Sequence, residues 1–213
     1  MRPEEELRSA CRLRSARAAA ERYDAWAGTY DKGFARAMGY VAPRRIAEVF
    51  AARAGAEDAP VLDVGAGTGL VAEALPGREI DGIDISRGML ARAGEKGLYR
   101  RRIVADLTQP LALGDAGYGG IVSAGTFSHG HAGAEALPEL LRVARPGALF
   151  ALGTIPAVFD EARIGSALAL MVAGGAITPV GFVEIAIYEG AEHPHMHDRG
   201  LVMVFRKRGS EAP

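Results

Sequence analysis

The segment from Val61 to Gly69 constrains the fold of this chain more than any other feature. Residues 61–64 follow Pro60 and are typical of a short buried strand in a parallel sheet. Three alternating glycines, at positions 65, 67 and 69, then permit a sharp turn and a close approach of the backbone to a ligand, because a Cβ there would collide. A helix beginning near 68–70 offers free N–H groups to anything bound on the turn. The segment predicts a strand–turn–helix unit of an α/β fold.

Two classes of ligand compete for this turn. A dinucleotide fingerprint has glycines at its first, third and sixth positions, but the sixth position here is Leu70. Asp63 places a carboxylate two residues before the first glycine, where a pyrophosphate has little use for it and a positively charged ligand is easier to accommodate. A tight strand–helix connection without a ligand is the remaining interpretation.

A second strand is indicated by residues 79–86, and its acidic residue Asp84 stands 21 positions after Asp63. In a doubly wound sheet, a carboxylate at the tip of the second strand reaches the ribose hydroxyls of a nucleoside lying across the first turn. Asp81 is expected inside the strand, and Ser86 is a good N-cap for a helix over 87–95. The alternative role for Asp84 is that of a carboxylate at the entry of that helix.

Four motifs in order resemble those of class I S-adenosylmethionine-dependent methyltransferases: 62–69 (LDVGAGTG), 83–86 (IDIS), 105–107 (ADL) and 141–148 (LRVARPGA). The resemblance implies an α/β, doubly wound, Rossmann-like sheet of seven mostly parallel strands in the order 3-2-1-4-5-7-6, with strand 7 antiparallel. It also implies S-adenosylmethionine as cofactor and S-adenosylhomocysteine as product.

The resemblance assigns a part of the cofactor to each motif. The glycine turn is expected to hold the homocysteine part, Asp84 the ribose, Ile85 the adenine face and Asp106 the adenine amino group. The full set of cofactor-binding residues that we expect is Tyr23, Tyr30, Asp63, Gly65, Ala66, Gly67, Thr68, Gly69, Asp84, Ile85, Ser86, Met89, Ala105, Asp106, Leu107 and Ser123.

A narrower likeness concerns the N-terminal part. Segments 23–31 (YDAWAGTYD), 38–43 (MGYVAP) and 136–143 (ALPELLRV) are similar to the Williams–Beuren-region methyltransferase-like proteins and their bacterial relatives. We expect a helical cap or lid over 1–55, an S-adenosylmethionine-binding domain over 56–208 and a tail over 209–213. The cap aromatics either contact the cofactor, shape an acceptor pocket or pack the cap onto the domain, and Tyr23 and Tyr30 are favoured for cofactor contact.

The remaining segments alternate between strand and helix patterns, which favours a parallel sheet with helices on both faces. We expect strands at 102–105, 120–124, 148–155, 182–188 and 201–205. We expect helices at 135–145, ended by Pro146-Gly147, and at 159–172.

Composition restricts the classes of partner. The 213 residues carry a net charge of −1 with no basic stripe, which argues against a nucleic-acid substrate. The chain has no run of 18 apolar residues and its first 20 residues have no apolar signal-peptide core, so neither a membrane span nor secretion is expected. The single cysteine, Cys11, fits a reducing cytoplasm. These features predict a cytoplasmic protein but give no oligomeric state.

All five histidines lie in two segments that we expect at the carboxyl edge of the sheet. His129 follows the fourth strand and is the candidate general base, while the alternative is a residue that shapes the cofactor site or is merely a polar loop residue. The cluster of His193, His195 and His197 offers metal ligands, but we expect a solvated loop without metal, separated from the fourth strand by strands 5 and 7.

Methyl transfer from a sulfonium is an in-line displacement, so alignment and water exclusion can suffice unless the acceptor must lose a proton. The sequence therefore predicts a methyltransferase that acts on a small-molecule acceptor. One alternative is a partner protein that binds S-adenosylmethionine without catalysis. The other is a nicotinamide-dependent oxidoreductase, which Leu70 disfavours.

Overall fold

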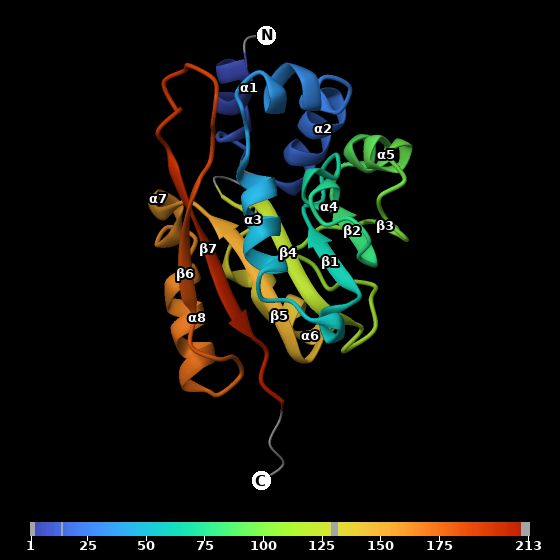
Figure 1. Cartoon of the computed structure of the whole chain (residues 1–213), viewed down its shortest axis with the longest axis vertical. Coiled ribbons are helices and arrows are strands. Elements are labelled where there is room, and N and C mark those ends of the chain that lie inside the picture. Colours follow the sequence, from blue (N-terminus) through green and yellow to red (C-terminus); the bar gives the residue numbers. More distant parts are fainter. Residues whose placement is uncertain (1–2, 14, 129–131, 210–213) are drawn as a thin grey trace.

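A single seven-stranded sheet forms the centre of the molecule, in the order β3-β2-β1-β4-β5-β7-β6 (Figure 1). The structure is a computed structural model that describes residues 3–13, 15–128 and 132–209. β1 pairs in parallel with β2 and β4, and β7 runs antiparallel to both β5 and β6. The predicted strand order and the antiparallel seventh strand are confirmed.

The strands are β1 (Val61–Val64), β2 (Ile80–Asp84), β3 (Arg102–Val104), β4 (Tyr118–Phe127), β5 (Ala144–Thr154), β6 (Gly181–Ala186) and β7 (Arg199–Arg206). The α-helices are α1 (Pro3–Ala10), α2 (Ala16–Trp26), α3 (Ala42–Ala51), α4 (Leu70–Glu73), α5 (Arg87–Glu95), α6 (Leu137–Val143), α7 (Pro156–Phe159) and α8 (Ile164–Ala173). A π-helix, η1 (Tyr30–Arg36), and the 3-10 turns η2 (Ala56–Asp58) and η3 (Ala134–Ala136) complete the elements.

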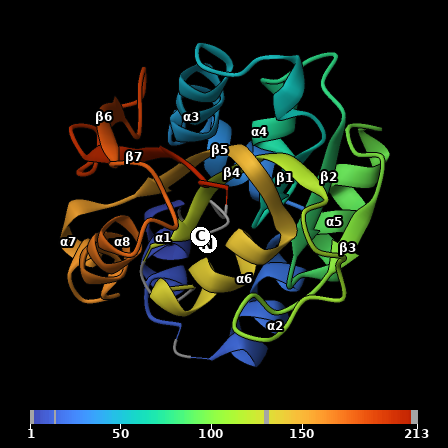
Figure 2. The same cartoon turned by 90° about the horizontal axis from the view of Figure 1, so that it is seen from below.

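Helices cover both faces of the sheet, as Figure 2 shows in the view from below. On one face α3, α4 and α5 pack through residues such as Phe50, Val71 and Leu90. On the other face α6 and α8 pack through Leu140 and Ile164. Every residue of β1 is buried because the strand has helices on both sides, which is the expected environment for a central parallel strand.

The cap consists of α1, α2 and η1, which lie together at one end of the sheet (Figure 1). Its own apolar cluster includes Trp26, Phe34 and Met38, and reaches Met89 of α5 and Tyr188 beyond β6. The next helix, α3, packs on β4 and β5 rather than within this cluster. The division of the chain into a cap over 1–55 and a domain over 56–208 remains a prediction.

Two predicted helices differ in extent from those observed. The helix expected over 135–145 is shorter, with η3 and then α6, because Ala144 already has extended backbone angles and pairs with Tyr118 as the first residue of β5. The helix expected over 159–172 begins later, as α8 at Ile164, and the short helix α7 precedes it and ends at Phe159. Arg163, whose φ of 54° is left-handed, is the N-cap of α8, so the two helices are not continuous.

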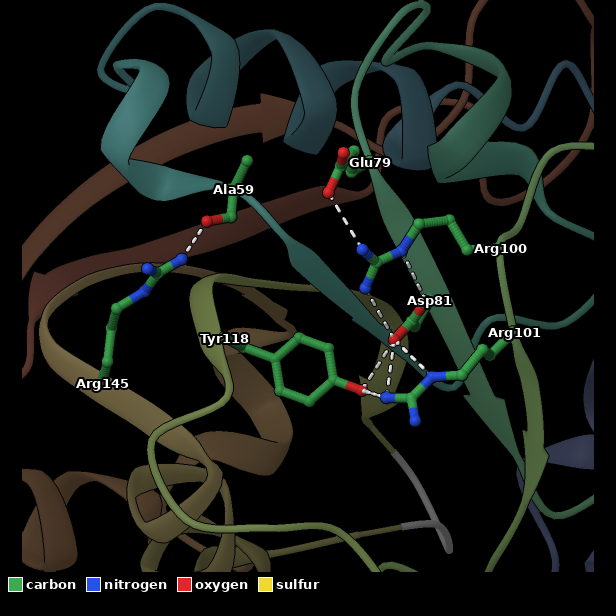
Figure 3. A network of polar contacts seen from close by, with 7 residues as sticks. All are labelled: Ala59, Glu79, Asp81, Arg100, Arg101, Tyr118 and Arg145. Atoms are coloured by element: carbon green, nitrogen blue, oxygen red, sulfur yellow. Dashed lines mark hydrogen bonds and ion pairs between the residues drawn. The ribbon is translucent and has the colours of Figure 1, made fainter.

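One buried carboxylate, Asp81 in the middle of β2, is surrounded by donors (Figure 3). Arg100 donates to its Oδ1 at 3.0 Å, while Arg101 and Tyr118 donate to its Oδ2 at 3.0 and 2.9 Å. Burial by itself raises the pKa of Asp81, but the hydrogen bonds from Arg100, Tyr118 and Arg101 outweigh it and hold that pKa below its usual value. As expected from the sequence, Asp81 lies inside the strand, and it serves the fold.

Candidate functional site

A cavity of about 690 Å³ lies where the glycine turn after β1 meets the ends of β2 and β4 and the underside of the cap. This volume lies within the range of about 300–1,000 Å³ that is common for small-molecule and cofactor sites. Twelve of the sixteen predicted cofactor-binding residues line it: Tyr23, Tyr30, Gly65, Ala66, Gly67, Thr68, Asp84, Ile85, Met89, Ala105, Asp106 and Leu107.

The three glycines of the turn all have positive φ, but for different reasons. A Cβ on Gly65 would collide with Thr126 Oγ1, and one on Gly69 would come within 2.9 Å of Leu98, so both positions are restricted by the protein itself. A Cβ on Gly67 would meet no atom of the described residues closer than 4.0 Å, although Gly67 lines the cavity. Gly67 is therefore the glycine whose missing side chain leaves room for a ligand.

Asp84 is held rigidly at the tip of β2. Its Oδ2 accepts a hydrogen bond from Gly67 N at 2.8 Å and its Oδ1 accepts one from Ser86 N at 2.8 Å. Burial raises the pKa of Asp84 above its usual value, although both of these N–H groups act in the opposite direction. Each carboxylate oxygen still has a free lone pair, so Asp84 can accept two further hydrogen bonds, as a diol would supply.

Four predicted residues do not line the cavity: Asp63, Gly69, Ser86 and Ser123. Ser86 is the N-cap of α5, where its Oγ accepts from Met89 N at 3.0 Å. Ser123 is buried and donates to Val64 O at 2.7 Å, so it fastens β4 to β1. Ser86 and Ser123 therefore stabilise the elements around the cavity without lining it.

Asp63 faces the sheet layer covered by α3, α4 and α5, where it is fully buried. Its Oδ2 accepts a hydrogen bond from Tyr99 Oη at 2.6 Å, while its Oδ1 has no hydrogen-bond partner among the described residues. Burial raises the pKa of Asp63 to about 7, against the opposing effect of the Tyr99 hydrogen bond. The nearby charge of Asp84 raises it further.

We expect Asp63→Asn to increase the free energy of unfolding at pH 8 and to change it little near pH 4. The folded chain keeps the Asp63 proton up to about pH 7, whereas the unfolded chain releases it near about pH 3.9. Between these values the natural protein loses stability as the pH rises, by about 1.4 kcal/mol for each unit of pKa difference. Asparagine removes this loss and can still accept from Tyr99. Urea unfolding at several pH values measures the difference, with exposed Asp115→Asn as the control; equal pH slopes for Asp63→Asn and the natural chain would contradict the assignment.

Two acidic residues of the cap, which sequence reasoning missed as site residues, tie the cap to the elements around this cavity. Asp24 Oδ1 accepts from Ser86 Oγ at 2.6 Å and from Gly88 N at 2.7 Å, at the start of α5. Asp31 Oδ1 accepts from Thr68 Oγ1 of the glycine turn at 2.5 Å. The signal was present in the sequence, because the dipeptide Tyr-Asp occurs at 23–24 and again at 30–31.

A second cavity, of about 660 Å³, adjoins the first. The two share five lining residues: Tyr23, Tyr30, Tyr40, Gly125 and Ser128. The second cavity extends from this shared wall beneath α1 to the ends of β5 and β6 and the segment before β7. The cap aromatics thus contribute both to their own packing and to the walls of the two cavities.

The histidine predictions have different outcomes. His129 lies outside the described residues, between Ser128 and Ala132, which both line the first cavity. As expected, β5 and β7 lie between β4 and β6 in the sheet, but His195 of the other cluster still lines the second cavity together with Gly125 and Ser128. The segment between β6 and β7 reaches over the sheet edge, and His193 bonds Met38 O of the cap region at 2.9 Å.

Within 3–13, 15–128 and 132–209, no group of three or more His, Cys, Asp or Glu side chains is arranged to hold a metal ion. No helix in the same ranges has the length and apolar character needed to cross a membrane.

Comparison with known sequences places residues 62–152 in the family described as "Methyltransferase domain". The chain is 38% identical to human methyltransferase-like protein 27 over 138 residues, which is 62% of this chain. It spans 56% of the length of that relative. The family match favours the methyltransferase interpretation over a nicotinamide-dependent oxidoreductase.

Solved structures share the fold at low sequence identity. A chain from the complex between the Haloferax volcanii Trm112 methyltransferase activator and a methyltransferase has a TM-score of 0.66 at 18% identity, covering 91% of this chain and 99% of that chain. The [4+2]-cyclase SpnF has a TM-score of 0.68 at 16% identity, covering 92% and 98%. Since one of these is a cyclase, the fold alone does not define the reaction.

Proposed function

We propose that this chain, which belongs to the class I S-adenosylmethionine-dependent methyltransferases, transfers a methyl group from S-adenosylmethionine to a small-molecule acceptor. The observation that carries the proposal is the Asp84 carboxylate, fixed by Gly67 N and Ser86 N at the wall of a cavity that a side chain at Gly67 would fill. A second, adjoining cavity supports a small acceptor.

The described residues fit the cofactor. Asp84 would accept the ribose hydroxyls, Ile85 and Met89 offer apolar surface to the adenine, and the turn leaves room for the amino-acid part beside Gly67. Asp106 would accept from the adenine amino group and is itself oriented by Thr108, whose N and Oγ1 donate to it at 2.9 and 2.7 Å. When bound, the cofactor supplies an activated methyl group, and the work of the chain is alignment and exclusion of water by the cap.

The first test is the affinity of Asp84→Ala for S-adenosylhomocysteine, measured by calorimetry. Loss of hydrogen bonds to a charged acceptor should weaken binding by about 1.5–3 kcal/mol. Asp115→Ala, which removes an exposed carboxylate remote from both cavities, should bind like the natural chain. Circular dichroism checks that Asp84→Ala stays folded. Unchanged affinity in a folded Asp84→Ala chain would remove Asp84 from this role.

The second test separates catalysis from binding alone and small acceptors from large ones. The chain is incubated with methyl-labelled S-adenosylmethionine and separate fractions of small molecules, protein and RNA from a cell extract. We expect label in the small-molecule fraction. Label in protein or RNA would overturn the small acceptor, and binding without any transfer would favour a non-catalytic partner protein.

A further inference from the structure

Two groups of side chains with different chemistry line the second cavity. The aromatic wall consists of Tyr23, Trp26, Tyr30, Phe34, Tyr40 and Tyr188. The basic group consists of the arginines Arg8 and Arg199, and the imidazole of His195 also lines the cavity.

The aromatic wall is continuous. Trp26 packs edge-on against Tyr30 with ring centroids 4.8 Å apart, and the ring contacts continue through Phe34 to Tyr40 and from Tyr40 to Tyr188, each at 5.7 Å. Rings held this way offer a rigid, apolar surface on which a planar ligand can stack or pack edge-on. The wall begins at the tyrosines shared with the first cavity and leads away from it.

Three hydroxyls on this wall have no hydrogen-bond partner in the part of the chain that the structure describes. Among the described residues, no hydrogen bond is formed by the hydroxyls of Tyr30, Tyr40 or Tyr188, although Tyr188 is only 6% exposed. Burial raises the pKa of Tyr40 to about 12 and that of Tyr188 well above its usual value. These groups therefore stay protonated at neutral pH and can donate to acceptor atoms of a ligand.

The two arginines that line the second cavity favour an anionic ligand. Asp198 is the single acid that lines the cavity among the described residues, and it is engaged by His195 Nδ1 at 3.0 Å. The cavity is also lined by two arginines, Arg8 and Arg199. Arg199 is only weakly paired, because its Nε lies 3.9 Å from Glu184 Oε1. Guanidinium groups match carboxylates well, whereas they disfavour a protonated amine.

We propose that the second cavity is the acceptor site and that its ligand is an aromatic carboxylate, with the ring on the tyrosine wall and the carboxylate toward Arg8 and Arg199. This inference rests on the proposed function, because it gives that function its substrate class. Tyr23, Tyr30 and Tyr40 also line the cofactor cavity, so the group of the ligand that receives the methyl is expected beside these tyrosines.

The test uses 2-naphthoate as the probe, titrated by calorimetry into the full chain saturated with S-adenosylhomocysteine. We expect 2-naphthoate to bind about tenfold more tightly than the neutral 2-naphthalenemethanol, and the cationic 2-naphthylmethylamine to bind most weakly. Equal affinity of all three, or preference for the amine, would overturn the anion specificity.

Variants locate the probe. Arg8→Gln with Arg199→Gln should reduce 2-naphthoate affinity about tenfold, while Arg36→Gln, an exposed arginine of the cap that lines neither cavity, should leave it unchanged. Ala157→Phe adds bulk at an exposed lining position of α7 and should abolish 2-naphthoate binding without changing the affinity for S-adenosylhomocysteine. Retained 2-naphthoate binding in Ala157→Phe would place the probe elsewhere.

Nuclear Overhauser effects between the two bound ligands test whether the site serves the reaction. We expect cross-peaks between 2-naphthoate and S-adenosylhomocysteine in the ternary complex. Absence of these cross-peaks, or absence of 2-naphthoate binding while S-adenosylhomocysteine binds, overturns the acceptor site and leaves the proposed function intact. Absence of S-adenosylhomocysteine binding overturns the proposed function and the acceptor assignment with it.

Discussion

A chain carrying Gly67→Val is expected to stay folded and to lose at least about 100-fold in affinity for S-adenosylhomocysteine, more than 2.7 kcal/mol. The Cβ itself is tolerated by the fold, since a Cβ at this position lies 4.0 Å from Gly65 O and farther from everything else among the described residues. The added methyl groups would project into the space that a ligand on the turn must occupy. Calorimetry measures the affinity, and urea unfolding measures the stability.

The control for this variant must separate backbone strain from obstruction of the ligand. Gly97→Val is suitable, because Gly97 has a φ of +66° where Gly67 has +53°, and a Cβ on Gly97 meets nothing within 4 Å. Both variants force a branched residue into the left-handed region, at about 1–2 kcal/mol. Gly97 lies outside both cavities, so this variant should bind normally. Equal loss of affinity in the two variants would mean that strain, and not the occupied space, weakens binding.

The second large effect is expected at the buried carboxylate of β2. Replacing both Arg100 and Arg101 by methionine should reduce the free energy of unfolding by about 3–5 kcal/mol, because Asp81 is 0% exposed and would lose its charged partners. Methionine preserves most of the apolar stem of each arginine, so the loss reports the charge rather than the packing. Since these arginines hold the pKa of Asp81 low, the loss should be greatest above pH 4 and shrink as Asp81 becomes protonated.

Two comparisons make this result specific. A third substitution, Asp81→Leu, on the background of both methionines should restore much of the stability, because it removes the unpaired buried charge. Methionine at both Arg44 and Arg45, whose partner Glu189 is 39% exposed, should reduce the unfolding free energy far less, because solvent screens exposed ion pairs. A similar loss in both double variants, or no recovery with Asp81→Leu, would contradict a buried ion network.

The sequence predicted the part of the site that is formed by residues close together in the chain or at the ends of neighbouring strands. A strand, a glycine turn and a helix are encoded within residues 61–73, and Asp84 is fixed by its position at the end of the neighbouring strand. The direction in which Asp63 points was not predicted. Side chains alternate along a strand, so Asp63 shares the face of Val61 and faces Tyr99, 36 residues away, instead of the cavity.

The features that escaped sequence reasoning depend on contacts between distant segments. Asp24 lies 62 residues from Ser86, and Asp31 lies 37 residues from Thr68, and no local pattern states either pairing. His195 reaches the second cavity because the segment between β6 and β7 folds over the edge of the sheet, whereas strand order alone placed it two strands away from β4. The topology gives the order of the strands in the sheet, but it does not give the path of the loops that connect them.

The repeated Tyr-Asp dipeptide has a thermodynamic consequence. Each tyrosine, at 23 and 30, forms part of a ligand wall, and the aspartate beside it closes the cap onto Ser86 or onto Thr68 of the glycine turn. A ligand that orders the turn therefore raises the free energy needed to open the cap, and a closed cap strengthens ligand binding by the same amount. Hydrogen exchange of α2 should slow in proportion to ligand occupancy. A product that leaves through an opened cap requires these bonds to break although they involve no atom of the product, and we expect cap opening to contribute to the turnover rate.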